Sequence, residues 1–294
     1  MMNNFIQFEL WKECSQHCPF CFNRGQKAVD KDKSFTYILN TLNHIEPDSY
    51  DYFGLIGGEF FNGEMVGYEE LFKTTLNRMV ELNPKKIFIT TSLLFDIGLH
   101  LIPFLKDIQF KDKIVLCTSW DIKYRFHNQE QQALWAKNVL WLRNHFPELE
   151  VHVEMIITQH LIDAVLAKHI QFDLFKQVFK CSLDFIEPSS GLYFKGKEDC
   201  QKALPGFFPT KVSFIKFLNC IKRDIDLQTF LAMDYRSNEL HYYEDGLLSV
   251  ASDRRETAGR CELRDKTRGY EIGFIDSEES MRDVVVAFNE LTSE

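Results

Sequence analysis

The chain has 294 residues and a formal net charge of −9, with 45% hydrophobic and 26% charged residues. This composition is typical of a globular protein with a large core and shows no basic stripe, so it gives no support for direct binding to duplex nucleic acid. No stretch reaches the ~18 uninterrupted apolar residues that a membrane span needs, and the start of the chain lacks the basic region of a signal peptide. We therefore expect a cytoplasmic protein, in which clustered cysteines indicate metal or redox chemistry rather than disulfides.

Short β-rich runs alternate with helical patterns over residues 1–225, as is typical of βα units that build a parallel sheet. The predicted strands are 5–11, 52–58, 86–92, 113–119, 150–158 and 182–188. Apolar residues at helical spacing occur at 34–45, 68–82, 128–146 and 210–225. This order predicts an α/β fold, either a partial (βα)6 TIM-like barrel or an open α/β sheet.

The pattern changes after residue 225, where we place a domain boundary. Short strands are expected at 230–235, 239–253 and 269–276, followed by a helix at 277–291. The middle segment is predicted to be a hairpin that turns at Glu244-Asp245-Gly246. Residues 226–294 are therefore predicted to form a small α+β C-terminal extension.

Three cysteines follow the first predicted strand with the spacing C-x3-C-x2-C, at Cys14, Cys18 and Cys21. A structural zinc ion usually takes four protein ligands, so a zinc site would need His17 as the fourth ligand within one short loop. A [4Fe–4S] cluster takes one thiolate per iron, and three thiolates leave one iron open to bind another molecule. The spacing favours the cluster, and a non-enzymatic zinc-binding module is the alternative.

This motif resembles the signature of the radical SAM enzyme superfamily, which has an aromatic residue just before the third cysteine. The resemblance implies a [4Fe–4S] cluster on Cys14, Cys18 and Cys21, with S-adenosylmethionine (SAM) on the open iron and Phe20 near its adenine. It also implies an enzyme that cleaves SAM reductively to a 5′-deoxyadenosyl radical, which abstracts hydrogen from a substrate. A flavodoxin or ferredoxin would supply the electron.

A second motif, Gly57-Gly58-Glu59, follows the second predicted strand. It resembles the Gly-Gly-Glu-Pro element of the same family, with Phe60 in place of proline. The resemblance implies that the backbone and the carboxylate hold the methionine ammonium group of SAM, for which a closely approaching backbone and an anion are suited. The end of the third predicted strand, around 90–92, is similar to the family's Thr-Asn-Gly element, but Asn and Gly are replaced.

The fourth predicted strand ends at Ser119, and Asp121 follows two residues later. This Ser-x-Asp pattern is similar to a strand end that helps to hold the SAM ribose in the peptide-modifying branch of the family. The alternative is that the two residues cap the helix that follows.

The C-terminal extension resembles the SPASM or twitch domain of the same branch, which carries an auxiliary cluster. Here Ser-Val-Ala-Ser, residues 249–252, stands where a cysteine is expected. We expect a cluster-free relic of that domain, and an auxiliary cluster on Cys200, Cys220 and Cys261 is the alternative. Considered singly, Cys117 and Cys220 are expected to be small buried hydrophobes.

The resemblance to the peptide-modifying branch favours a peptide or protein side chain as the substrate. A nucleoside or another small metabolite is the alternative, because compact members of the family act on small substrates.

Overall fold

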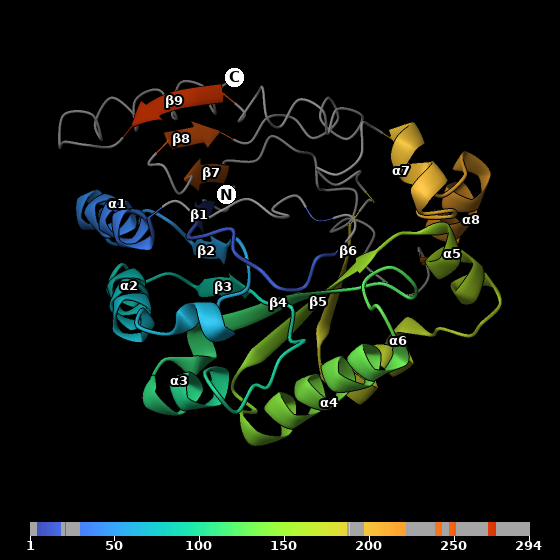
Figure 1. Ribbon diagram of the computed structural model, residues 1–294, viewed down its shortest axis with the longest axis horizontal. Coiled ribbons are helices and arrows are strands. Elements are labelled where there is room, and N and C mark those ends of the chain that lie inside the picture. The colour runs from blue at the N-terminus through green and yellow to red at the C-terminus, as the bar shows by residue number, and fades with distance from the viewer. Residues whose placement is uncertain are drawn as a thin grey trace.

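The computed structural model describes residues 5–18, 21, 30–186, 188, 197–221, 239–242, 247–250 and 270–274. One nine-stranded sheet, in the order β6-β5-β4-β3-β2-β1-β7-β8-β9, forms the centre of the protein (Figure 1). The first six strands are β1 (Phe5–Glu9), β2 (Tyr52–Ile56), β3 (Lys86–Thr90), β4 (Ile114–Trp120), β5 (Glu150–Ile156) and β6 (Ser182–Ile186). They pair in parallel with their sequence neighbours, which confirms the predicted α/β fold with six parallel strands.

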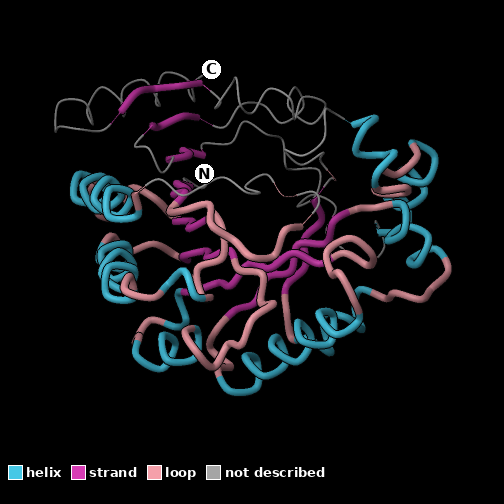
Figure 2. The backbone as a smooth tube through the Cα atoms, in the orientation of Figure 1, coloured by secondary structure: helices cyan, strands magenta, loops and turns pink. Residues whose placement is uncertain are grey.

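Helices connect these strands. They are α1 (Lys31–His44), α2 (Glu69–Glu81), α3 (Leu101–Asp107), α4 (Gln129–His145), α5 (Gln159–Leu166), α6 (Phe172–Phe179), α7 (Lys197–Ala203) and α8 (Lys211–Ile221), with short 3-10 turns at η1 (Gly63–Met65) and η2 (Lys111–Lys113). Helices α1 to α4 and α6 lie outside the curved sheet, so the architecture is a partial TIM-like barrel (Figure 2).

Alternation along the strands decides which face of the sheet meets the helices. In β5, Val151, Val153 and Met155 are buried, whereas the intervening Glu150, His152 and Glu154 are half-buried. Side chains two residues apart on a strand share a face, so the apolar set packs under the helices and the polar set lines the concave face. This arrangement leaves a polar inner surface at the centre of the partial barrel.

Side-chain caps fix the starts of three helices. Asp30 accepts hydrogen bonds from the N–H groups of Asp32 and Lys33 at the start of α1. Asn128 and Thr158 act in the same way at the starts of α4 and α5. Such caps satisfy N–H groups that have no partner within the helix, and they fix where each loop after a strand ends.

The C-terminal strands continue the sheet beyond β1. Strand β7 (Glu239–Tyr242) pairs in parallel with β1, β8 (Leu247–Val250) is antiparallel to β7, and β9 (Tyr270–Phe274) is antiparallel to β8. The two strands of the predicted hairpin are confirmed, as is the strand within 269–276. The hairpin turn, the predicted strand at 230–235 and the predicted helix at 277–291 lie outside the described residues. The boundary near residue 225 stays a prediction.

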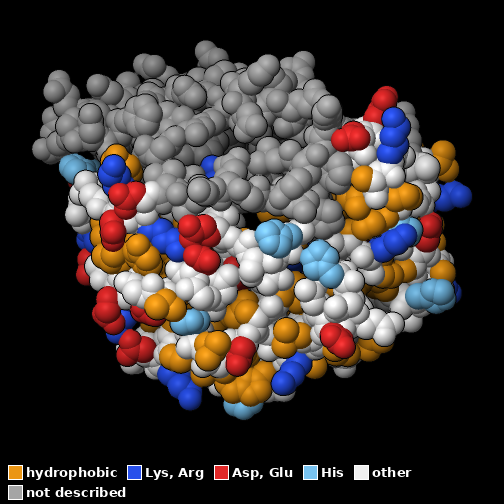
Figure 3. Space-filling view, viewed as in Figure 1, with side chains coloured by type: hydrophobic (Ala, Val, Ile, Leu, Met, Phe, Trp, Pro, Cys, Tyr) orange, Lys and Arg blue, Asp and Glu red, His pale blue; other side chains and the backbone are white. Residues whose placement is uncertain are grey.

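In the part of the chain that the structure describes, no helix is long and apolar enough to cross a membrane. On the face shown in Figure 3, the described Lys and Arg side chains are interspersed with Asp and Glu rather than gathered into one patch.

Candidate functional site

The predicted site residues come from loops at one edge of the sheet. The cysteine motif follows β1, the Gly-Gly-Glu motif follows β2, and the Ser-x-Asp motif lies at the end of β4. Because the strands are parallel, their carboxyl ends share one edge, where α/β sheets usually bind ligands. The topology therefore brings together three motifs that are up to about a hundred residues apart in the sequence.

The first two motifs are joined by backbone hydrogen bonds that continue the β1–β2 pairing beyond both strands. Leu10 N–H donates to the carbonyl oxygen of Ile56 at 3.1 Å, and Gly58 N–H donates to that of Trp11 at 2.6 Å. Glu59 N–H then donates to the carbonyl oxygen of Glu13 at 3.0 Å. The backbone is thus fixed up to the residue immediately before Cys14.

Glycine is required at positions 57 and 58 for this close approach. A Cβ atom on Gly57 would lie 2.1 Å from the carbonyl oxygen of Trp11, and one on Gly58 would lie 1.8 Å from that of Glu13. Gly57 also has φ +147°, a conformation that other residues rarely adopt. The two glycines therefore allow the backbone of the second motif to lie directly against the start of the cysteine loop. Their contact with SAM stays a prediction.

Glu59 is buried at this junction, with an exposed fraction of 1%. Its Oε1 accepts hydrogen bonds from Thr91 Oγ1 at 2.9 Å and from the Phe61 N–H at 3.2 Å, and its Oε2 accepts one from the Ser92 N–H at 2.6 Å. Burial raises the pKa of this carboxyl group, and the hydrogen bonds from Ser92, Phe61 and Thr91 act in the opposite direction. A carboxylate has about four acceptor positions, so three donors leave room for an ammonium group.

The cysteine loop is held by the loops that follow β3 and β4. Gln16 Nε2 donates to the carbonyl oxygen of Leu94 at 3.2 Å, in the loop after β3. His127 Nε2 donates to the carbonyl oxygen of Gln16 at 2.9 Å, from the loop after β4. Each contact ties the loop to a different strand end, so the loop has a defined position at this edge of the sheet.

The three thiols differ in their surroundings. Cys18 is buried, whereas Cys14 and Cys21 are half-buried. Burial raises the pKa of the Cys14 thiol to about 12, and the charge of Glu59 adds to this increase. Thiolates are the metal-binding form of cysteine, so metal binding at Cys14 must release its proton.

A buried arginine lies against Cys18. Arg125 has an exposed fraction of 5%, and its Nη1 is 2.7 Å from the Cys18 sulfur. Its Nε donates to the carbonyl oxygen of Ser119 at 3.3 Å. The guanidinium group therefore bridges the end of β4 and the cysteine loop.

Asp121 fixes the turn that presents this arginine. Its carboxylate accepts hydrogen bonds from the N–H groups of Lys123, at 3.1 Å, and Tyr124, and from Thr158 Oγ1 at 3.0 Å. The alternative that Asp121 caps the next helix is wrong, because Asn128 is the N-cap of α4. The predicted ribose contact of Ser119 and Asp121 stays a prediction.

Acidic side chains lie beside Ser119 on the concave face. Ser119 is in register with Glu154 of β5, which is in register with Asp184 of β6. All three are half-buried, and each is followed by a buried apolar residue, namely Trp120, Met155 and Phe185. This row offers hydroxyl and carboxylate groups to a molecule inside the partial barrel.

A [4Fe–4S] cluster fits the donor set of the loop. Within the described residues, no three His, Cys, Asp or Glu side chains converge closely enough to hold a single metal ion, and His17 is exposed with φ +48°. A cluster distributes its thiolates over separate iron atoms, so it does not need them around one ion. Three thiols on one loop suit a cluster with one open iron, and the buried Arg125 beside Cys18 suits its negative charge.

Phe20 and the remaining cysteines lie outside the junction of the three motifs or outside the described residues. Phe20 and Cys261 lie outside the described residues. Cys117 is buried, as expected, but the expectation that Cys220 is buried is wrong, because it is exposed on α8. Cys200 is buried on α7 against Ile156, Leu204 and two phenylalanines. The absence of an auxiliary cluster stays a prediction.

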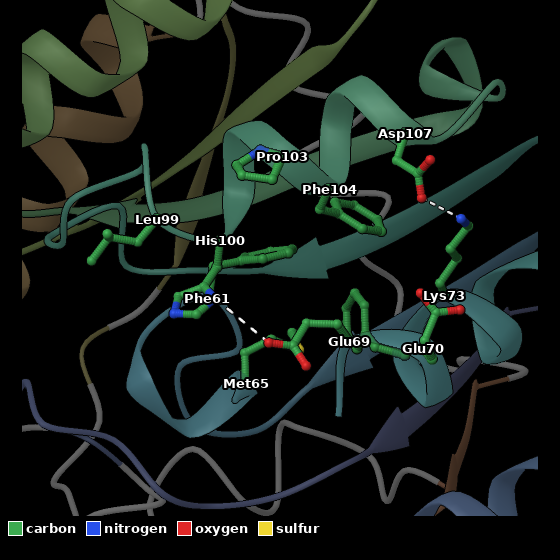
Figure 4. A pocket seen from close by; sticks show the side chains of 11 residues that line it. Phe61, Met65, Glu69, Glu70, Lys73, Leu99, His100, Pro103, Phe104 and Asp107 are labelled. Atoms are coloured by element: carbon green, nitrogen blue, oxygen red, sulfur yellow. Dashed lines mark hydrogen bonds and ion pairs between the residues drawn. The ribbon is translucent and has the colours of Figure 1, made fainter. Parts of the chain in front are cut away.

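A cavity of about 360 Å³ lies away from these motifs, between α2 and α3 (Figure 4). Its floor is apolar, and its rim carries the ion pair between Lys73 and Asp107 and a contact of 4.0 Å between His100 and Glu69. Among the described residues, Phe61 joins the cavity to the site, because it lines the cavity and donates its N–H to Glu59. The chemistry of the three motifs is therefore outside this cavity.

No family model and no curated protein matches this sequence, but solved structures do. Two structures of anSMEcpe, one with bound AdoMet and one with bound AdoMet and the Kp18Cys peptide, match with TM-scores of 0.59 and 0.60. In both, the match covers 99% of this chain and 84% of anSMEcpe at 15% identity. This chain has the fold of anSMEcpe. Streptococcus suis SuiB bound to S-adenosylmethionine matches with a TM-score of 0.53 and 13% identity, over 95% of this chain and 63% of SuiB.

Sequence patterns did not identify every residue of the site. Arg125 lies in no recognisable motif, and its contact with Cys18 spans 107 positions. Thr91 and Ser92 belong to the segment that resembles a family element, but nothing in the sequence indicates that they bind Glu59. The strand order supplies this information, because β3 lies next to β2.

Proposed function

We propose that this protein is a radical SAM enzyme whose [4Fe–4S] cluster is held by Cys14, Cys18 and Cys21. The observation that carries the proposal is the junction of the cysteine loop with the Gly-Gly-Glu segment, in which Gly58 N–H binds the Trp11 carbonyl at 2.6 Å. Two motifs that match the same family are thereby joined at the carboxyl edge of a parallel sheet. The fold supports the proposal, because anSMEcpe, which has this fold, binds AdoMet.

When bound, the cluster and SAM supply a 5′-deoxyadenosyl radical that abstracts a hydrogen atom from the substrate. The three cysteines would hold the cluster, and the Glu59 carboxylate would pair with the ammonium group of SAM beside the backbone of Gly57 and Gly58. Thr91 and Ser92 orient this carboxylate, because each donates a hydrogen bond to a different oxygen of Glu59. The network keeps the carboxylate in one position before the ligand arrives.

The adenosine half of SAM is assigned to the neighbouring loops. We place Phe20 near the adenine and Ser119 near the ribose. Asp121 supports the ribose site through the turn that it fixes. A flavodoxin or ferredoxin is proposed to supply the electron that reduces the cluster.

The proposed substrate is a peptide or a protein side chain. The resemblance of the C-terminal segment to SPASM or twitch domains supports this choice. So does the fold, because one structure of anSMEcpe, which shares it, contains a bound peptide. The row of Ser119, Glu154 and Asp184 on the concave face offers groups that can bind the polar atoms of such a substrate.

Electron paramagnetic resonance (EPR) of anaerobically reconstituted, dithionite-reduced protein tests the proposal. We expect a [4Fe–4S]⁺ signal that shifts when SAM is added, and formation of 5′-deoxyadenosine. Cys14→Ala should abolish the SAM-dependent shift and the product, whereas Cys220→Ala, at an exposed cysteine on α8, should retain both. Stoichiometric zinc without a cluster signal, or full activity of Cys14→Ala, would overturn the proposal.

A further inference from the structure

Arg125 is a cation removed from solvent at the centre of the candidate site. Its exposed fraction is 5%, and the turn that carries it is fixed by hydrogen bonds to the Asp121 carboxylate. Among the described residues, it donates hydrogen bonds to the Ser119 carbonyl oxygen, at 3.3 Å, and to the Cys18 sulfur, at 2.7 Å. The side chain is therefore aimed at one particular ligand of the proposed cluster.

No carboxylate in the described part of the chain pairs with this arginine. Among the described residues, no Asp or Glu oxygen lies within 4.0 Å of its guanidinium nitrogens. Burying a cation is strongly unfavourable unless an anion or several strong acceptors compensate for the lost hydration. The carbonyl of Ser119 is a neutral acceptor, so the contact with Cys18 marks the place where negative charge is needed.

A cluster at Cys18 supplies that charge. Three thiolates outweigh the positive charge of an oxidised cluster core, and reduction adds one more negative charge. A nearby cation and an N–H donor to sulfur stabilise the reduced form more than the oxidised form, since its sulfurs carry more negative charge. Hydrogen bonds to the sulfurs and net charge are general determinants of the reduction potential of iron–sulfur clusters.

The ligands are unequal in this respect. The Cys14 sulfur accepts from the backbone N–H of Gln16 at 3.5 Å, which is a neutral and longer contact. Cys18 faces a charged donor at 2.7 Å. Of these two ligands, Cys18 therefore receives the stronger electrostatic effect.

We propose that Arg125 is a positioning residue that acts through Cys18, donating a hydrogen bond to its sulfur in the loaded protein and making the cluster easier to reduce. This inference rests on the proposed function, since it requires a cluster on the cysteine loop. It assigns to the turn after β4 a role in the redox chemistry that is separate from the predicted ribose contact at the end of the same strand.

The test is a redox titration of reconstituted protein without SAM, followed by the EPR signal of the reduced cluster. Arg125→Gln should lower the ratio of reduced to oxidised cluster at a fixed potential by about tenfold, which equals a midpoint ~59 mV lower for a one-electron couple. Arg125→Lys should show a smaller decrease, because the charge remains but the planar fork is lost. Arg143→Gln is the matched control and should keep the wild-type midpoint, because Arg143 binds the carbonyl oxygen of Lys180, in the segment that precedes β6.

The possible results separate the two proposals. A wild-type midpoint in Arg125→Gln, at equal iron content, overturns this inference alone. A wild-type midpoint together with weaker SAM binding, seen as a higher SAM concentration for the EPR shift, assigns Arg125 to the SAM carboxylate and also overturns it. If Arg125→Gln takes up no cluster, the midpoint of Arg125→Lys decides, and a value equal to wild type overturns the inference. A wild-type chain that forms no cluster overturns the proposed function as well.

Discussion

Replacing Gly58 by alanine should displace the cysteine loop. The new Cβ would lie 1.8 Å from the carbonyl oxygen of Glu13, a backbone atom that cannot rotate away. Ordinary contact begins at 3.4 Å, so the two segments must separate by about 1.6 Å. That separation breaks the hydrogen bonds from Gly58 to Trp11 and from Glu59 to Glu13, which are 2.6 and 3.0 Å long. At about 1 kcal/mol for each bond, and more for buried groups left unpaired, the free energy of unfolding should fall by about 2–4 kcal/mol.

Urea unfolding of the metal-free protein measures this loss, and iron and sulfide per chain after reconstitution measure the effect on the site. Gly63→Ala is the matched control, because a Cβ there meets nothing within 4 Å. It should change the free energy of unfolding by less than about 0.5 kcal/mol and leave the iron content unchanged. The reasoning is refuted if Gly58→Ala equals Gly63→Ala in both measurements.

Two further substitutions test the polar groups of the barrel. Thr91→Val removes the 2.9 Å hydrogen bond to Glu59, so the pKa of this carboxyl group should rise further. The affinity for SAM should fall by about fivefold to tenfold. A SAM titration followed by EPR measures this affinity, and an unchanged value would contradict the prediction. Burial lowers the pKa of His152 below its usual 6.5 in the folded protein. The unfolded chain therefore binds a proton at this residue more readily than the folded protein, and the free energy of unfolding should fall as the pH drops below 6.5. His152→Gln should remove this part of the pH dependence. Urea midpoints at pH 7.5 and 5.0 measure it, and an equal loss of stability in the wild type and in His152→Gln would disprove the assignment.

The sheet was predictable because its strands are short apolar runs separated by polar segments. All six strands of the barrel lie within the predicted ranges or within one residue of them. The first predicted strand extends to Trp11, whereas β1 ends at Glu9. The residues after Glu9 still form backbone hydrogen bonds with the segment at the end of β2, but they are not part of the strand. Helices α3, α5 and α6 have only seven or eight residues, and the spacing of apolar residues in the sequence does not predict them individually.

The site was predictable only where a motif marks it. Cys14 and Glu59 were proposed because their motifs resemble those of a known family, but the donors that bind Glu59 come from the segment after the next strand and depend on the strand order. Arg125 follows no pattern, since its contact with Cys18 arises from a turn whose N–H groups bind the Asp121 carboxylate. Cys220 shows the opposite error, because the average burial of cysteine says nothing about which side of α8 it occupies.

The position of β1 between β2 and β7 has a consequence for the order of folding. The strand that leads into the cysteine loop pairs on one side with residues 52–56 and on the other with residues 239–242. During synthesis, β1 therefore keeps an open edge until most of the chain has left the ribosome, and an open edge invites pairing with other chains. A polypeptide that stops before residue 239 would retain that open edge permanently, beside the three thiols. Shortened forms of this protein should therefore aggregate through the strand that carries the cysteines, and they are poor material for asking what the C-terminal extension does.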